Sequence, residues 1–412
     1  MIRALVLAIA AALALAPATQ DAAPFELPRP TGPYAVGTTA WRVTDPIRKE
    51  TFTGGGEPRQ VEVIAWYPAA TGAGARAPYL REGLAEARTF AKLLRSADTI
   101  FDGLQRVQTH AAIDAVPAAS PRRFPTLVMS AGFTGSPSAH TALVEDLASH
   151  GYAVLNVVHP YEETAATLAD GRVVSMLTAA GGPLPGLLEI FAEWAKEDEI
   201  MAAVAKSADT AERLRLLRGY LSGLQRTTAA VHRWVDDSKL VLNTLAAIPA
   251  ESPGGRLSAR LDAARLGLFG HSMGGVMAGQ FCLEDERCVA GLNLDGSPQS
   301  GDLIDRTMPR PFLMMYTARD RKGANDAIYQ RAARTYYRID VPDTLHLDFC
   351  DMTFWGGPLR ERKVLGSIAP ARVTDIMRAV VRGFFDQELR GRRAALSAGL
   401  TSFPAVSFKT IK

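Results

Sequence analysis

The chain has 412 residues, 47% of them hydrophobic, and a formal net charge of +3 at pH 7. A chain of this size can bury a large hydrophobic core in one or two domains. Acidic and basic residues are interspersed without a long basic stripe, which argues against a nucleic-acid-binding protein.

The N-terminus has the pattern of an export signal. Arg3 supplies a positive charge, residues 4–16 are apolar, and Ala16-Pro17-Ala18 offers small residues for cleavage. The apolar run is too short for a membrane span. We therefore expect residues 1–20 to be a signal peptide and the protein to be secreted or periplasmic. An uncleaved N-terminal anchor is the alternative.

The first elements of the mature chain are strands. Residues 34–45 and 59–68 each predict a strand, and the second alternates polar and apolar residues, as an outer antiparallel strand does. Residues 79–96 are rich in Ala, Leu and Arg and predict a helix.

The next elements indicate a parallel sheet. A buried strand is predicted over residues 125–130, then a loop over 131–136, a helix over 141–149 and a second buried strand over 152–158. This succession indicates a right-handed parallel crossover.

Residues 185–248 are predominantly helical, and we expect a helical insertion at about 185–225. Residues 187–194 are amphipathic. Three readings stay open for them: an ordinary amphipathic helix, a cap over the active site, or a membrane-surface patch.

Residues 266–275, Leu-Gly-Leu-Phe-Gly-His-Ser-Met-Gly-Gly, carry the chemistry of the chain. An apolar strand runs into G-x-S-x-G and then into a predicted helix. This pattern is typical of a nucleophile elbow, which exposes the Ser272 hydroxyl on a strained turn. Gly270 and Gly274 flank the serine because a Cβ at either place would collide with the neighbouring strand or helix. A glycine-rich turn with a bystander serine is the alternative.

The rest of the chain predicts strand, strand, helix, strand and helix, over residues 289–294, 311–316, 324–335, 336–341 and 371–389. No internal repeat or low-complexity linker occurs. We therefore predict one α/β domain over residues 21–412. The expected architecture is an α/β-hydrolase fold: a mostly parallel central sheet with helices on both faces and a helical insertion.

A serine nucleophile needs a base, and the base needs an orienting acid. In α/β-hydrolases these residues follow the chain order serine, acid, histidine. Of the seven histidines, His346 alone lies after Ser272. It also follows the last predicted strand, so we predict His346 as the base. His271, next to the serine, is expected to be a structural neighbour.

Two aspartates are candidates for the acid. Asp295 follows one predicted strand and Asp320 follows the next, at the same carboxyl edge of the sheet. The commonest hydrolase arrangement favours Asp320, but the spacing alone leaves both open.

The three cysteines suggest one disulfide. Cys282 and Cys288 bracket an acidic turn and, in an exported protein, could bridge a helix end to the next strand. Cys350 would then be a free, buried thiol. No zinc-site spacing and no phosphate- or dinucleotide-binding motif occurs, so no cofactor and no metal is expected.

Over roughly residues 60–385 the chain resembles the secreted platelet-activating-factor acetylhydrolases and their bacterial relatives. The similar segments are Trp66-Tyr67-Pro68, the S-H-G-x-G-like loop 130–135, the D-L-A-S-H-G-aromatic segment 146–152, the elbow 270–275, Leu294-Asp295-Gly296, and the H-x-x-F-x-D-x-T-F-like segment 346–354. On this resemblance Asp295, rather than Asp320, is the acid.

One position departs from the family pattern: Ala131 stands where the family loop usually has histidine. A backbone oxyanion hole made by the N–H groups of Phe133 and Met273 survives that change. The change bears instead on side-chain tuning of substrate head groups.

The resemblance implies a secreted serine ester hydrolase that cleaves short-acyl phospholipids or related lipid esters through Ser272, His346 and Asp295. One alternative is a cutinase-like or polyester-hydrolase-like esterase on non-phospholipid esters. Another is a non-catalytic binding protein of the same fold, against which the complete set of three residues argues. The expected partner is an ester substrate, with lipid as a candidate and peripheral membrane contact left open. The oligomeric state is not indicated by the sequence.

Overall fold

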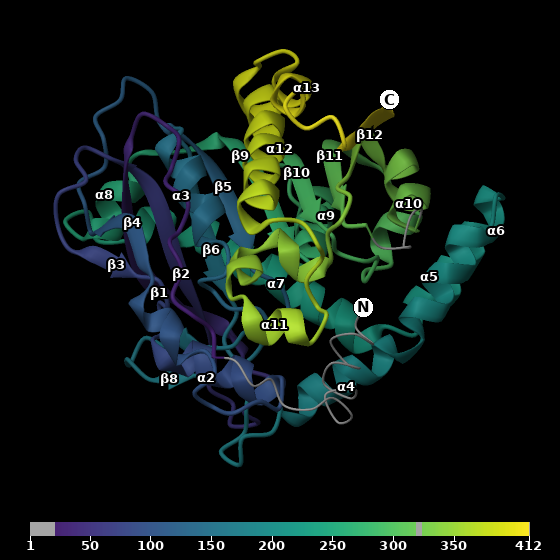
Figure 1. Ribbon diagram of the computed structural model, residues 1–412, viewed down its shortest axis with the longest axis horizontal. Coiled ribbons are helices and arrows are strands. Elements are labelled where there is room, and N and C mark those ends of the chain that lie inside the picture. Colours follow the sequence, from purple (N-terminus) through teal and green to yellow (C-terminus); the bar gives the residue numbers. More distant parts are fainter. Residues whose placement is uncertain (1–20, 319–323, 412) are drawn as a thin grey trace.

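The computed structural model describes residues 21–318 and 324–411. The predicted signal peptide, residues 1–20, and Asp320 lie outside the described residues. Within them the central sheet has 11 strands, in the order β13-β12-β11-β10-β9-β5-β6-β2-β1-β4-β3 (Figure 1). The strands are β1 Ala35–Lys49, β2 Pro58–Ala69, β3 Arg76–Pro78, β4 Gln108–Ile113, β5 Phe124–Ser130, β6 Ala153–Val158, β9 Leu261–His271, β10 Cys288–Leu294, β11 Met308–Tyr316, β12 Ala333–Asp340 and β13 Ser407–Ile411. A separate hairpin consists of β7 Ala166–Thr167 and β8 Val173–Val174.

The middle of the sheet is parallel. Strands β6, β5, β9, β10, β11 and β12 are neighbours that run in one direction, and β2 and β13 pair antiparallel to the two ends of this group. The chain from β5 through helix α3, Thr141–Ser149, to β6 forms the parallel crossover that the sequence predicts. The carboxyl ends of the parallel strands therefore meet at one edge.

The expectation of an outer strand over residues 59–68 is wrong. Strand β2 lies between β1 and β6, and its side chains from Val61 to Ala69 are buried. Its polar member Glu62 is buried and pairs at 2.6 Å with the partly exposed Arg42, so the polar position of the alternating pattern is buried with a charged partner.

Helices cover both faces of the sheet (Figure 1). Successive side chains of β5 point to opposite faces: Leu127 and Met129 join the core beneath α3 and α12, whereas Val128 joins the core beneath α7 and α9. The helices are α2 Leu84–Leu93, α4 Pro185–Glu193, α5 Glu197–Lys206, α6 Thr210–Leu221, α7 Gln225–Thr244, α8 Pro253–Ser258, α9 Met273–Glu284, α10 Ala324–Ala332, α11 Gly357–Glu361, α12 Pro370–Arg390 and α13 Ala395–Leu400, with α3 as above. This mostly parallel sheet between two helical layers is the predicted α/β-hydrolase fold.

A helical insertion leaves the sheet between β6 and β9. Its helices α5 and α6 lie at the outer edge of the molecule beside α10 (Figure 1). The apolar side of α4 is turned inward: Leu187 and Phe191 are buried, and Trp194 immediately after the helix is buried as well. Leu188 is 49% exposed. The inward packing accounts for the amphipathic pattern of residues 187–194.

Among the described residues, none of the helices combines the length and apolar character needed to cross a bilayer.

The predicted disulfide between Cys282 and Cys288 is confirmed. It joins the last turn of α9 to the first residue of β10, with Cα atoms 5.1 Å apart. Cys350 is free and buried, as expected.

Candidate active site

Ser272 stands on a sharp turn between β9 and α9. Its backbone has φ 56° and ψ −125°, a region that residues with a Cβ rarely adopt. The turn is fixed to the end of β10, because the Ser272 N–H donates to the Leu294 carbonyl at 2.9 Å. Such strain costs of order 1–3 kcal/mol and persists only where the surroundings impose it.

The glycines beside Ser272 are there for space, as the sequence predicts. A Cβ on Gly274 would overlap the carbonyl of Ser130 at the end of β5, and a Cβ on Gly270 would overlap the backbone of Gly274. Strand β5 and the start of α9 can therefore approach each other closely only with glycine at these positions.

His346 and Asp295 meet at the carboxyl edge of the sheet. His346 Nδ1 lies 2.8 Å from Asp295 Oδ2, and both side chains are buried. The other oxygen, Oδ1, accepts hydrogen bonds from the N–H and hydroxyl of Thr317, each at 3.0 Å. The carboxylate is thus fixed by three donors, with the imidazole on one side.

His271 supports His346 from below, in line with the role of structural neighbour. Its Nε2 donates to the His346 carbonyl at 3.0 Å, and the two rings lie 4.2 Å apart. Burial, followed by the neighbouring His346, lowers the pKa of His271 to about 3. His271 therefore stays neutral and adds no charge beside His346.

Ser272 and His346 open into one small cavity of about 40 Å³. All but two of its lining residues are buried; Gly135 and Ser272 are partly exposed. The lining consists of Phe90, Ala131, Gly132, Phe133, Thr134, Gly135, Ala139, His140, Trp194, His271, Ser272, His346, Leu347, Cys350 and Met352. Trp194 and Phe133 lie edge to face with ring centroids 5.4 Å apart, so the insertion closes one side of the cavity. This geometry fits the cap reading of residues 187–194.

Of the two predicted oxyanion donors, Phe133 lines this cavity and Met273 directly follows Ser272. Met273 is the first residue of α9, where backbone N–H groups have no partner within the helix. Phe133 lies in the loop after β5, and this loop passes so close to Ser272 that a Cβ on Gly132 would meet the Ser272 Cβ at 3.3 Å. Within residues 21–318 and 324–411, neither N–H donates to a protein acceptor.

The loop that carries Phe133 is anchored from behind. The Thr134 N–H donates to the Glu162 carbonyl at 2.8 Å, and the Thr164 N–H donates to the Gly135 carbonyl at 2.9 Å. At the start of the loop, Ser130 Oγ lies 3.0 Å from His159 Nε2. Hydrogen bonds therefore hold both ends of the loop against the segment that follows β6.

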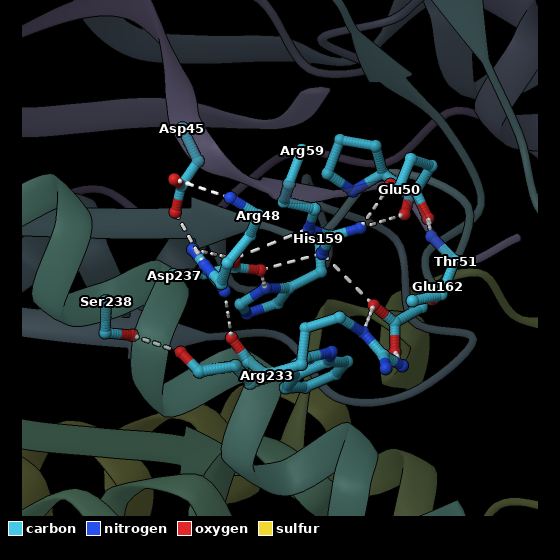
Figure 2. Close-up of polar contacts among 12 residues, drawn as sticks. Asp45, Arg48, Glu50, Thr51, Arg59, His159, Glu162, Arg233, Asp237 and Ser238 are labelled. Atoms are coloured by element: carbon cyan, nitrogen blue, oxygen red, sulfur yellow. Dashed lines mark hydrogen bonds and ion pairs between the residues drawn. The ribbon is translucent and has the colours of Figure 1, made fainter. Parts of the chain in front are cut away.

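That segment rests on a buried ionic network, shown in Figure 2. The Arg59 guanidinium lies 2.7 Å from Glu50, 3.1 Å from Glu162 and 2.7 Å from Asp237. His159 Nδ1 donates to Asp237 at 2.9 Å. Burial alone would raise the pKa of Asp237, but Arg59 and His159 lower it well below its usual value, so this carboxylate is ionised.

No pattern in the sequence indicates this network. Its charged residues come from the turn between β1 and β2, from β2, from the loop after β6 and from α7, and no motif links them. The network can be recognised only once the folded structure shows which of these residues lie next to one another.

In the described residues, one group could hold a metal ion: His232, Glu284 and Asp302, away from the cavity. The carboxylates of Glu284 and Asp302 already have partners within the protein. Lys239 Nζ lies 2.7 Å from Glu284, and the Gln280 amide donates to both carboxylates. An ammonium group at this distance disfavours a bound cation.

Comparison with known proteins agrees with this architecture. Residues 21–393 match the family model of platelet-activating factor acetylhydrolase, isoform II. The chain is similar to platelet-activating factor acetylhydrolase of Cavia porcellus, with 25% identity over 248 residues, or 59% of this chain and 52% of the relative. It is also similar to a "Probable 1-alkyl-2-acetylglycerophosphocholine esterase" of Arthroderma benhamiae, with 28% identity over 169 residues, or 35% of this chain and 43% of the relative. The chain thus spans about half the length of these relatives.

Among solved structures, a ferulic acid esterase from Streptomyces cinnamoneus matches with a TM-score of 0.69 and 27% identity. The match covers 94% of this chain and 99% of that one. Most of the chain therefore has a counterpart in a solved structure.

Proposed function

Because the chain belongs to the platelet-activating factor acetylhydrolase isoform II family, we propose that it is a carboxylic ester hydrolase that acts through Ser272, His346 and Asp295. One observation carries the proposal. The imidazole of His346, held by Asp295 at 2.8 Å, lines the same small cavity as a serine on a strained turn. A nucleophile beside an oriented base is the minimum that acyl transfer requires.

In the first half of the reaction, Ser272 Oγ attacks the ester carbonyl while His346 Nε2 takes the serine proton. Asp295 keeps the Nδ1–H tautomer in place and stabilises the imidazolium that forms. The bonds from Thr317 to the second carboxylate oxygen stop Asp295 from rotating away. His346 then gives the proton to the departing alcohol.

The oxyanion of the tetrahedral intermediate is held by the N–H groups of Phe133 and Met273. Met273 also stands at the positive end of the α9 dipole. Donors that are fixed before the reaction do not have to reorganise when charge develops on the carbonyl oxygen. In the second half, His346 activates a water that hydrolyses the acyl-enzyme and regenerates Ser272.

The proposed substrate is a short-acyl phospholipid or a related lipid ester. The cavity of about 40 Å³ supports a short acyl group, and the names of the two relatives supply the phospholipid class. A non-phospholipid ester is the second candidate, supported by the match to a ferulic acid esterase over 94% of this chain.

We further propose that residues 1–20 direct export and that residues 21–412 act as one domain. The Cys282–Cys288 disulfide supports an oxidising compartment.

Covalent labelling tests the activity. A fluorophosphonate probe should label the wild-type protein and fail to label Ser272→Ala, while the exposed Ser402→Ala control labels normally. Ser272→Ala should also lose at least about 10³-fold in kcat. Labelling of Ser272→Ala at wild-type level would refute the assignment, and absence of labelling in the wild type would favour a non-catalytic binding protein.

A substrate panel tests the specificity. Acetyl-bearing and long-chain phosphatidylcholines, methyl ferulate and p-nitrophenyl esters of increasing acyl length should be compared by kcat/KM. We expect short-acyl phospholipid to exceed methyl ferulate; the reverse order would favour the second candidate.

A further inference from the structure

A second and larger pocket lies at the opposite edge of the sheet from Ser272. Its volume is about 550 Å³. Phe124, the first residue of β5, lines this pocket, whereas Ala131, directly after the last residue of β5, lines the cavity at Ser272. At about 3.3 Å per strand residue, β5 separates the two sites by roughly 20 Å. A ligand in the second pocket therefore does not compete with an ester at Ser272.

Five arginines from three parts of the chain line this pocket, which we call the arginine pocket. They are Arg122 and Arg123 before β5, Arg265 on β9, Arg390 at the end of α12, and Arg392 just after it. No aspartate or glutamate is among the described residues that line it. Two carboxylates, Asp262 and Asp386, pair with three of the five guanidinium groups. The pocket thus holds an excess of three positive charges, a repulsive arrangement that a bound anion relieves.

Two of the guanidinium groups are fixed in place. Arg265 Nε lies 2.6 Å from Asp262, and Arg390 Nη1 lies 3.0 Å from Asp386. The Arg390 guanidinium also stacks on the ring of Tyr152, 3.8 Å from its centroid. Their side chains are only 26% and 14% exposed. Because these groups are already ordered, a ligand that contacts them loses little of its binding free energy to the ordering of side chains.

Arg122 and Arg123 differ from this fixed pair. Both are exposed at the rim of the pocket. Within residues 21–318 and 324–411, no ion pair involves the side chain of either residue. Each guanidinium carries five N–H donors, so the two arginines offer hydrogen-bonding capacity that no carboxylate of the protein uses.

The shape and charge of the pocket indicate the class of ligand. Guanidinium groups bind phosphate and carboxylate oxygens in pairs. A tetrahedral phosphate presents oxygens in several directions, so arginines that converge from different segments can share one group, whereas a carboxylate presents two oxygens in one plane. An excess of three charges matches more than one phosphate. The volume of about 550 Å³ lies within the roughly 300–1,000 Å³ of small-molecule sites.

We propose that the arginine pocket binds a ligand that carries two or more linked phosphate groups, either a soluble oligophosphate or the headgroup of a lipid with two phosphates. This binding site is separate from the ester-hydrolysing site and does not depend on the proposed esterase function. Its occupation leaves the cavity at Ser272 open to substrate.

Titration calorimetry with sodium tripolyphosphate at low salt tests the site. Wild-type protein should bind, and Arg122→Ala/Arg123→Ala should raise Kd at least about 10-fold, because two charge-assisted contacts are lost. The control Lys206→Ala/Arg306→Ala removes two exposed cations outside the pocket and should leave Kd within about 2-fold. Absence of binding to the wild type would overturn the proposal, as would equal weakening in the two double variants.

A second probe tests the phosphate class. Citrate carries about the same negative charge on carboxylates, and we expect it to bind at least about 10-fold more weakly than tripolyphosphate. Equal affinity for the two anions would overturn the assignment to phosphate. Calorimetry needs no ester turnover, so failure of the esterase function would leave this test intact, and unchanged Tm shows that the variants are folded.

Sedimentation with vesicles distinguishes the two sources of phosphate. The vesicles contain phosphatidylcholine with 20 mol% cardiolipin, a lipid with two phosphates, or phosphatidylcholine alone. Binding to the cardiolipin vesicles that tripolyphosphate displaces, and that Arg122→Ala/Arg123→Ala loses, would support a lipid headgroup. Tripolyphosphate binding without sedimentation would support a soluble oligophosphate.

Discussion

Oγ of Ser130 lies 3.0 Å from Nε2 of His159, at the point where β5 leads into the loop of Phe133. With Asp237 on Nδ1, the three side chains repeat the order serine, histidine, aspartate found at the candidate active site. All three are fully buried, at 0% exposure, so substrate cannot reach them. Their consequence is positional: they fix the strand end and the loop that present the Phe133 N–H.

Asp237→Asn should weaken both stability and catalysis. The substitution leaves Arg59 with less compensating charge in a fully buried position, which costs about 3–5 kcal/mol for a broken buried pair. The loop then holds its oxyanion donor less firmly, so kcat should fall more than KM rises. Urea unfolding and steady-state kinetics measure the two effects.

Asp236→Asn is the matched control for this variant, since Asp236 is an exposed neighbour on the same helix. It should change neither quantity. A destabilised Asp237→Asn enzyme with wild-type kcat would show that the network stabilises the fold without positioning the loop.

Asp295→Asn and Asp320→Asn should differ sharply. An amide at position 295 would orient His346 in the wrong tautomer, and the expected loss in kcat is about 10³- to 10⁴-fold. Asp320→Asn should stay within about 3-fold of the wild type, because Asp295 already occupies Nδ1 of His346. Hydrolysis of p-nitrophenyl acetate by both variants decides between the two acids, and equal losses would contradict the assignment.

The contribution of Glu86 to stability should decline as pH rises from about 5 to 8. Burial raises the pKa of Glu86 from 4.5 to about 7, against the hydrogen bonds from Ser136 and Ser138. The folded protein therefore binds a proton that the unfolded chain has released. This contribution is fully present below pH 4.5 and is lost as pH rises through about 7, with a loss of roughly 3 kcal/mol. Glu145 shifts in the same direction, again mainly through burial.

Glu86→Gln tests this pH dependence. Its amide can keep a bond with Ser136 while remaining neutral, so the Tm of the wild type should fall relative to that of Glu86→Gln as pH rises from 5 to 8. The exposed Glu251→Gln serves as the control. A Glu86→Gln profile parallel to that of the wild type would show that Glu86 does not titrate in this range.

Removal of the disulfide should cost about 2 kcal/mol, because Cys282 and Cys288 close a short loop. Cys282→Ser/Cys288→Ser should therefore unfold at lower urea concentration than the oxidised wild type. Reduced wild type should match the double variant. Equal midpoints for oxidised and reduced protein would contradict this expectation.

The serine and the histidine of the candidate site could be predicted from the sequence because local patterns and chain order identify them. The turn around Ser272 needs glycines that leave a recognisable spacing, and the position of His346 follows from chain order. The acid is harder to predict, since in the sequence Asp295 and Asp320 each follow a predicted strand and the spacing does not decide between them. The family resemblance implies Asp295, and in the structure His346 Nδ1 is hydrogen-bonded to the Asp295 carboxylate.

Ion pairs between residues far apart in the sequence could not be predicted from local sequence patterns. Glu62 made β2 look half-exposed, whereas its pairing with Arg42 allows burial between two strands. Arg59 and Asp237 are separated by 178 residues, and only the folded chain brings them together.

The backbone of Ser272 has an implication for engineering. A glycine at this position would relax the φ of 56° at the expense of the hydroxyl group. A directed-evolution campaign that selects for heat resistance alone would therefore enrich inactive variants at the most important codon of the gene. Any such selection should couple survival to ester turnover, so that the strained turn is retained.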